Sequence, residues 1–160
     1  YCKSKGYQFI KRQKKLSKDN ANGNDLLNYH SKIIDADYYF QLFVTAPLLS
    51  VESINDCIKL LDKKKNIDSI LTIKEIYSWF WFKNKPVNYK PDLLPRSQDA
   101  SPIIQETTGL YGIKKEALRK FKCRIGKKPF FYKINDTESI DIDTEQDFKI
   151  LNDFFKRDTK

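Results

Sequence analysis

The sequence has no methionine, one histidine and three cysteines among its 160 residues. An odd number of cysteines without short spacing argues against a disulfide framework and against a zinc knuckle. With His30 as the sole histidine, a mixed Cys/His metal site and a histidine-activated nucleophile are both disfavoured. The cysteine pattern fits a reducing compartment, so we expect a cytoplasmic protein.

Long apolar runs are also missing. No stretch approaches the roughly 20 apolar residues that a membrane-spanning helix needs, so we expect no membrane partner. The opening stretch, YCKSKGYQF, lacks the apolar core of a signal peptide. It begins with tyrosine and runs almost directly into a strand-like segment, so we expect the natural start to lie upstream.

What the sequence does have is apolar and basic side chains. Hydrophobic residues make up 40% and aromatic residues 14%, which is enough for the core of one domain. The formal net charge of +9 favours anionic partners such as nucleotides, phosphates or nucleic acid. The lysines are scattered along the chain, however, and no RNA- or DNA-binding motif appears, so nucleic acid is the less favoured partner.

Strand-like and helix-like segments alternate along the chain. We expect strands at residues 7–11, 38–45, 69–73 and 130–134, and helices at residues 25–34, 51–61, 114–121 and 145–155. This alternation predicts an α/β three-layer fold with a mostly parallel sheet, in which ligands bind at the carboxyl ends of the strands. The continuous apolar run at 38–45 indicates a central strand buried on both faces.

The remaining segments are predicted from local signals. The proline-containing region after residue 73 indicates a long functional loop. Its aromatic block, residues 79–82, favours core or dimer-interface packing over base stacking. Thr144 and Asp147 resemble a capping box at the start of the last helix. We expect that helix to bury the apolar side chains Phe148, Leu151 and Phe155.

The sharpest chemical motif is Ser-Ile-Asp-Ile-Asp at residues 139–143. On a strand, Asp141 and Asp143 would share one side, roughly 6.6 Å apart. Two carboxylates at that spacing suit Mg²⁺ together with substrate phosphates. A solvated strand face is the other interpretation, because Asp-x-Asp is a common pattern.

Two arginines lie in segments that suit anion binding. Arg12 follows the first expected strand, where its guanidinium matches the geometry of a triphosphate. Arg96 and Gln98 lie in the proline-containing loop, where a basic and polar segment above a sheet can hold an acidic sugar. Ordinary surface positions are the alternative for both segments.

The order of the motifs resembles that of the acylneuraminate cytidylyltransferases, the CMP-sialic acid synthetases and their relatives, over about residues 6–151. The similar segments are GYQFIKRQKKLSKDNAN, FVTAPLLSVESI (family QPTSPLR), LPRSQD (family P-R-x-Q), ETTGLYGI (family N-G-A-I-Y) and SIDIDTEQD (family metal motif). The last segment is the most specific, because it completes an ordered series.

This resemblance implies a role for each matched residue. Asp141 and Asp143 take the places of the family's metal-binding, catalytic aspartates, with Mg²⁺ as the cofactor. Arg12 takes the place of the arginine that contacts the nucleotide phosphates. The other substrate-binding positions implied are Thr45, Arg96, Gln98, Thr108 and Gly109.

The resemblance also implies a function and an assembly. It implies transfer of CMP from CTP to an acidic sugar, sialic acid or a related nonulosonic acid, with release of pyrophosphate. On this match residues 1–160 are the C-terminal portion of a single domain with the Rossmann-like nucleotide-diphosphosugar transferase fold, its first strands missing. The family is typically dimeric, and residues 114–134 are the candidate dimerisation insert.

Several positions depart from the family pattern. Phe43 stands where the family has a glutamine that reaches the sugar, and Leu49 stands where it has an arginine. Thr108 replaces an asparagine, and Gly112 falls where a tyrosine is usual. These departures leave two alternatives beside the enzyme: a folded but inactive family member, and a basic α/β domain that binds nucleic acid.

Overall fold

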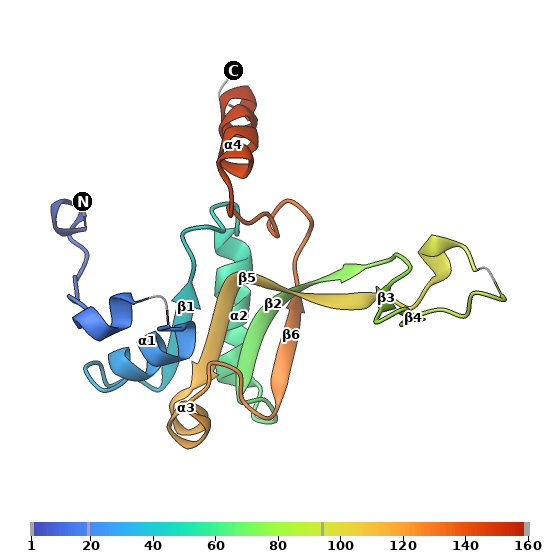
Figure 1. Cartoon of the computed structure of the whole chain (residues 1–160). Helices are drawn as coiled ribbons and strands as arrows, with labels where there is room; N and C mark the ends of the chain where they lie inside the picture. The colour runs from blue at the N-terminus through green and yellow to red at the C-terminus, as the bar shows by residue number, and fades with distance from the viewer. Residues whose placement is uncertain (1, 19, 94, 159–160) are drawn as a thin grey trace.

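A computed structural model describes residues 2–18, 20–93 and 95–158. Its centre is a four-stranded sheet in the order β1-β5-β2-β6, as Figure 1 shows. The strands are β1 (Tyr38–Leu42), β2 (Ser69–Ile76), β5 (Ile103–Lys114) and β6 (Pro129–Lys133). Their residues are rich in isoleucine, threonine, tyrosine and phenylalanine, which suit a pleated, half-buried surface. The α/β fold class is confirmed.

Strand β5 runs against the rest of the sheet. It pairs antiparallel with β1 on one side and with β2 on the other, whereas β2 and β6 pair in parallel. Three of the four strands therefore share one direction, as expected of a mostly parallel sheet. Two of the three pairings are nevertheless antiparallel, because the opposing strand lies inside the sheet.

Helices cover both faces of the sheet, which gives the three expected layers (Figure 1). Helix α2 (Val51–Lys63) packs Cys57 and Leu61 against Ile70 of β2 and Leu110 of β5. Helices α1 (Gly23–His30) and α3 (Lys115–Phe121) pack on the opposite face, around the buried side chains of Leu27, Tyr39, Ile113 and Leu118. Ser50 caps α2 as predicted, accepting a hydrogen bond from the Ser53 backbone N–H at 3.1 Å.

The expectation of a long loop from residue 73 to the helix at 114 was wrong at both ends, since β2 continues to Ile76 and β5 begins at Ile103. Residues 103–114 form β5, the longest strand. Its Gln-Glu-Thr-Thr-Gly sequence hides the strand, since glycine and acidic residues are depleted in strands. The register also shifts between Leu71 and Ile73, where β2 faces β5, so simple alternation fails there.

Three other expectations on the first half of the chain need correction. Residues 7–11 form no strand; in the described part of the chain before α1, the structure has the short 3-10 helices η1 (Lys3–Lys5) and η2 (Lys14–Ser17). Helix α1 begins at the Asn22 cap, whose capping box includes Asp25, and it ends four residues earlier than predicted. Strand β1 ends at Leu42 and occupies an edge of the sheet, so it is not a central strand.

Residues 77–102 form an arm that projects from the end of the sheet (Figure 1). It contains the two-stranded sheet of β3 (Trp81–Phe82) and β4 (Lys85–Pro86) and the 3-10 helix η3 (Ser97–Asp99). The aromatic block does not enter the core: Trp79, Trp81 and Phe82 are 42%, 58% and 66% exposed. Trp79 instead stacks on Tyr89, with ring centroids 5.4 Å apart.

Helix α4 (Glu145–Asp158) extends away from the sheet (Figure 1). Its predicted capping box is confirmed, since Asp147 accepts hydrogen bonds from the backbone and hydroxyl of Thr144 at 2.8 and 2.7 Å. Of its three expected core residues only Leu151 is buried; Phe148 and Phe155 are exposed because the helix stands clear of the sheet. None of the helices in the described residues is long and apolar enough to cross a membrane.

Candidate functional site

Three elements meet just beyond the carboxyl end of β1. The Thr45 carbonyl oxygen accepts a 2.8 Å hydrogen bond from the backbone N–H of Ile142. The Thr108 hydroxyl, on β5, donates to Oδ2 of Asp141. Three predicted site residues, Thr45, Thr108 and Asp141, are therefore brought together from segments that are far apart in the sequence.

Gly109 belongs to the same junction. Its carbonyl oxygen accepts a 3.3 Å hydrogen bond from the backbone N–H of Phe43, which continues the β1–β5 pairing past the end of β1. A Cβ at this position would lie 3.4 Å from the Thr72 hydroxyl and 3.7 Å from the Ala46 methyl group. The turn after β1 thus packs closely on the backbone of β5, beside Thr108.

The Asp141 carboxylate is only half satisfied. Oδ2 is held by Thr108, whereas Oδ1 is buried and has no hydrogen-bond partner among the residues that the structure describes. A buried carboxylate oxygen without a donor is costly, and such groups are normally paired with a donor or a cation. The orphaned oxygen therefore fits a site for a cation or for a ligand's donor group.

Asp143 lies in a different environment. It is exposed, and its backbone N–H donates to Oδ2 of Asp147 at 3.3 Å. The expectation that residues 139–143 form a strand was wrong. Ile142 makes its backbone bond to Thr45 and Ile140 makes a turn bond to Thr137, so no continuous ladder forms.

The donor set suits a Mg²⁺ ion that shares its coordination with substrate. No group of three His, Cys, Asp or Glu side chains that could hold a metal occurs within the described ranges. An octahedral Mg²⁺ ion has six ligands. Asp141, with its orphaned Oδ1, and Asp143 would supply fewer than half of them. This fits the usual Mg²⁺ site, which has one or two carboxylates completed by water and phosphate oxygens.

Glu138 fixes the segment that carries Asp141. Its buried Oε1 accepts hydrogen bonds from the hydroxyls of Ser50 and Ser53 at 2.5 and 2.6 Å and from the Ser50 backbone N–H at 3.1 Å. Burial by itself raises the pKa of this carboxyl, but the hydrogen bonds from Ser50, Ser53 and Asn135 outweigh it and hold the pKa below its ordinary value. The carboxylate thereby ties this segment to the start of α2.

Sequence reasoning missed a second group of polar side chains on the α1/α3 face of the sheet. The guanidinium of Arg124, in the loop between α3 and β6, lies 3.6 Å above the Tyr111 ring. Its Nη2 lies 3.5 Å from Oε1 of Glu106, the same oxygen to which the Tyr111 hydroxyl donates. In the sequence Arg124 is one of many basic residues, and only the stacking distinguishes it.

Tyr111 lies on β5, the same strand as Thr108, which holds Asp141. Burial and the hydrogen bond to Glu106 raise the pKa of Tyr111. The positive charge of Arg124 opposes that rise in pKa, whereas the charge of Asp141 adds to it. Both charges therefore lie within electrostatic reach of the Tyr111 phenol.

Gln41 adds a second orphaned oxygen near Arg124. It lies directly opposite Tyr111 in the β1–β5 register, and its Nε2 donates to the Gly23 carbonyl oxygen at 2.8 Å. Its Oε1 is buried without a partner among the described residues. Oδ1 of Asp141 is the other buried side-chain atom without a partner in the described chain.

Arg12 lies in the segment before α1, outside the sheet (Figure 1). It is exposed and lines a hollow with Phe9 and Lys14. No hydrogen bond or ion pair joins it to Asp141 within the described residues. Its expected contact with nucleotide phosphates stays a prediction.

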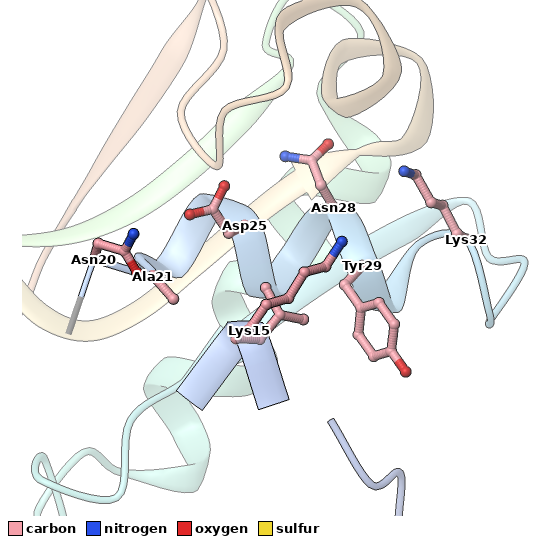
Figure 2. Close-up of a pocket in the computed structure, with 8 residues that line it drawn as sticks. Lys15, Asn20, Ala21, Asp25, Asn28, Tyr29 and Lys32 are labelled. Atoms are coloured by element: carbon pink, nitrogen blue, oxygen red, sulfur yellow. The ribbon is translucent and has the colours of Figure 1, made fainter. Parts of the chain in front are cut away.

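A separate cavity of about 410 Å³ lies between η2 and α1. Figure 2 shows Lys15 and Lys32 on either side of Tyr29 along this cavity. None of the predicted site residues lines it, and it lies on the outer side of α1, whose Leu27 faces the core. We therefore place the candidate site at Asp141 and Arg124, not at this cavity.

Arg96 and Gln98 are not brought to the Asp141 junction. Both are exposed on the projecting arm, around η3. The Arg96 guanidinium is occupied by the carboxylate of Asp99, with Nε–Oδ2 and Nη2–Oδ1 distances of 2.7 and 3.3 Å. Their expected contact with the sugar stays a prediction.

The candidate dimerisation insert, residues 114–134, is part of the domain itself. It contains the end of β5, helix α3 with its buried Ala117 and Leu118, and strand β6, which pairs with β2. Dimerisation through this insert also stays a prediction.

No model of a known protein family matches the chain, and no curated protein sequence matches it either. Solved structures do. The chain is similar to a CMP:2-keto-3-deoxy-manno-octonic acid synthetase complexed with CTP, with 12% identity and a TM-score of 0.63 over 88% of this chain and 70% of that one. It is also similar to the bifunctional IspDF from Campylobacter jejuni, with 18% identity and a TM-score of 0.60 over 91% of this chain and 37% of that one.

At these identities the likeness establishes the fold: the chain has the nucleotidyltransferase-like α/β fold of its two structural neighbours. The resemblance to the acylneuraminate type in particular stays a prediction. The residues that bear on function are those that this chain places at the junction of β1, β5 and residues 138–143.

Proposed function

We propose that this chain is a cytidylyltransferase domain that transfers CMP from CTP to an acidic sugar, sialic acid or a related nonulosonic acid. The observation that carries the proposal is the Asp141 carboxylate, held through Oδ2 by Thr108 with Oδ1 buried and unpaired. A fold shared with a synthetase complexed with CTP supports the choice of nucleotide. A homodimer and a cytoplasmic location belong to the same proposal.

The reaction breaks one P–O bond and forms another. The anomeric hydroxyl of the sugar attacks the α-phosphorus of CTP, loses its proton, and pyrophosphate leaves with the electron pair of the α–β bridge. Such transfers depend mainly on positioning and on neutralising charge, since the protein has little covalent work to do. Bound Mg²⁺, held by Asp141 and Asp143, would neutralise phosphate charge and help align the two reactants.

The chain's own residues keep this site in position. Thr108 fixes one oxygen of Asp141, which restricts the orientation of the carboxylate and therefore of its other oxygen. The bond from Ile142 to Thr45 fixes the backbone next to that carboxylate. In this proposal Arg12 binds phosphate oxygens, and Arg96 and Gln98 orient the sugar from the arm.

Pyrophosphate release from CTP, measured with Mg²⁺ and a panel of nonulosonic acids, tests this proposal in the full natural protein. We expect release with at least one acid. Asp141→Asn should lower it by about 100-fold or more, because several kcal/mol of charge stabilisation would be lost. Asp136→Asn, at an exposed turn residue nearby, is the matched control and should leave the rate unchanged.

Two results would overturn the proposal. One is no release with any acid from a protein shown to be folded, which favours the inactive family member suggested by Phe43 and Gly112. The other is an equal rate in Asp141→Asn and Asp136→Asn. Steeply salt-dependent binding of oligonucleotides, without transfer, would favour the nucleic-acid-binding alternative instead.

A further inference from the structure

Arg124 lies over Tyr111 of β5, the strand whose Thr108 holds Asp141. Its side chain is 22% exposed, and the guanidinium carbon lies 3.6 Å from the Tyr111 ring centroid and 5.6 Å from that of Phe43. Stacking on an aromatic face leaves the N–H groups of a guanidinium pointing outward in its plane. Such an arrangement presents a fork of donors with little freedom left to lose on binding.

The loop around Arg124 is held on both sides. The Arg124 backbone N–H donates to Oδ1 of Asn24, at the start of α1, at 2.8 Å. The next residues are fixed to β2, where the Gly126 backbone N–H donates to Ser69 and those of Lys127 and Lys128 donate to Asp68, at 2.8 to 3.0 Å. The guanidinium therefore rests on a fixed backbone.

Most of the donors of Arg124 are free to bind a ligand. Within the described chain its side chain makes one hydrogen bond, from Nη2 to Glu106 at 3.5 Å. Nη1 lies close to α1, where a Cβ on Gly23 would be 2.8 Å from it. A glycine at this position thus leaves room for the guanidinium, and Nε and Nη1 have no partner within the described residues.

We propose that Arg124 binds the carboxylate of the acidic acceptor, an inference that rests on the proposed function and names a specificity-determining residue for it. The guanidinium fork matches a carboxylate with two parallel N–H···O bonds. The charges around it favour this ligand over the CTP triphosphate. Arg124 already has the carboxylate of Glu106 beside it, so a singly charged anion is better balanced here than a triphosphate.

This assignment also accounts for where the arginines of the chain lie. Arg96, the arginine expected on the sugar side, is on the arm and occupied by Asp99. Arg124 comes from a different segment, yet the fold stacks it on Tyr111 of β5, the strand whose Thr108 holds Asp141. In such an acidic acceptor the carboxyl group is attached to the anomeric carbon, so a carboxylate bound at Arg124 would also restrict the position of the reacting hydroxyl.

The first test is steady-state kinetics of pyrophosphate release for the full natural protein, Arg124→Gln and Arg124→Lys. The acceptors are sialic acid and 2-keto-3-deoxy-manno-octonic acid, each compared with its methyl ester. We expect Arg124→Gln to raise the KM for the acids about 10- to 100-fold, as loss of hydrogen bonds to a charged group requires. The KM for CTP and the rates with the esters should stay within about twofold.

Arg124→Lys should recover part of the acid affinity, because it keeps the charge but loses the fork. Arg119→Gln, at an exposed arginine of α3 whose Nη2 lies 3.8 Å from Asp35, is the matched control and should behave as wild type. A KM for CTP that rises as much as the KM for the acids would assign Arg124 to the phosphates and overturn the proposal. Unchanged acid KM values would overturn it equally.

Gly23→Ala gives an independent test that keeps the arginine. The added methyl group displaces Nη1, and alanine favours the helix that begins here, so folding is not threatened. We expect weaker acid binding with an unchanged melting temperature. Two results together would contradict a role for the guanidinium fork. They are acid binding in Gly23→Ala equal to that of wild type, and an unchanged KM for the acids in Arg124→Lys.

Binding without turnover separates this inference from the proposed function. If the wild type releases no pyrophosphate, titration calorimetry of the two acids and of their methyl esters is the deciding measurement. Acid binding that is lost in Arg124→Gln but kept in Arg119→Gln would support the carboxylate site although the catalytic proposal had failed. No binding of either acid to the folded wild type would overturn the carboxylate site itself.

Discussion

The backbone N–H of Ile142 donates a 2.8 Å hydrogen bond to the carbonyl oxygen of Thr45. This one bond attaches the segment carrying Asp141 to the turn that follows β1. The hydroxyl of Thr108 attaches the neighbouring carboxylate to β5. The position of Asp141 therefore depends on β5 and on the turn after β1 as well as on its own segment, and this dependence can be tested by substitutions away from the carboxylate.

Thr108→Val removes the hydroxyl that donates to Asp141 and keeps the branched shape of the side chain. We expect a loss of about 10- to 100-fold in activity or in apparent Mg²⁺ affinity, the range typical of residues that orient a metal ligand. Thr108→Ser keeps the hydroxyl and should retain most of the activity. The Mg²⁺ dependence of pyrophosphate release measures both effects, and equal curves for valine and serine variants would contradict this role.

Glu138→Gln removes the carboxylate that ties residues 135–143 to the start of α2. We expect it to destabilise the folded state by about 1–3 kcal/mol at pH 7, because Ser50 and Ser53 lose a charged acceptor. The pKa of Glu138 is lowered in the folded state, so its contribution is present above the ordinary glutamate pKa and is lost as pH falls through the lowered value.

Urea unfolding at several pH values checks this. The difference in the free energy of unfolding between wild type and Glu138→Gln should be largest at neutral pH. It should shrink below about pH 4, near the ordinary glutamate pKa. Glu116→Gln, at an exposed position of α3, is the control for removing an exposed carboxylate. If the stability difference stays constant down to acid pH, the charged form of Glu138 is not its cause.

Gly112→Ala should destabilise the sheet by overpacking. Its Cβ would lie 2.4 Å from Cε1 of Phe40 and 2.8 Å from Cγ2 of Ile70. We expect a loss of about 1–3 kcal/mol in the free energy of unfolding, which Phe40→Leu should partly restore in the double variant. A Cβ in Gly109→Ala would have its nearest neighbour 3.4 Å away, so this variant should lose less stability. Equal unfolding midpoints in urea for Gly112→Ala and Gly109→Ala would contradict this explanation.

The cysteines should differ widely in reactivity. Cys57 is completely buried in α2, and burial, with the nearby charges of Asp56 and Glu138, raises the pKa of its thiol to about 12. Cys2 is exposed. We expect a thiol reagent at pH 8 to label Cys2 quickly and Cys57 only after unfolding. Peptide mapping over time measures this, and fast labelling of Cys57 would mean that α2 opens in the native state.

The helices and three of the four strands of the main sheet were predictable from local patterns. The Ser50 cap and the Thr144–Asp147 capping box follow from contacts between neighbours in the sequence, and β2 and β6 follow from their apolar and aromatic composition. Strand β5 did not, because its polar and glycine residues are accommodated by partners on two other strands. The close packing of Phe40 on Gly112 is one such accommodation, and no local pattern reveals it.

The sequence by itself determined the α/β class, the basic charge and the identity of Asp141 as a candidate ligand, because periodicity, composition and short motifs are local properties. Only the tertiary structure decided which of the candidates meet. It brought Thr45, Thr108 and Asp141 together, left Arg96 on the arm, and stacked Arg124 on Tyr111. These outcomes depend on strand order and register, which are set by the packing of the whole sheet and not by any one segment.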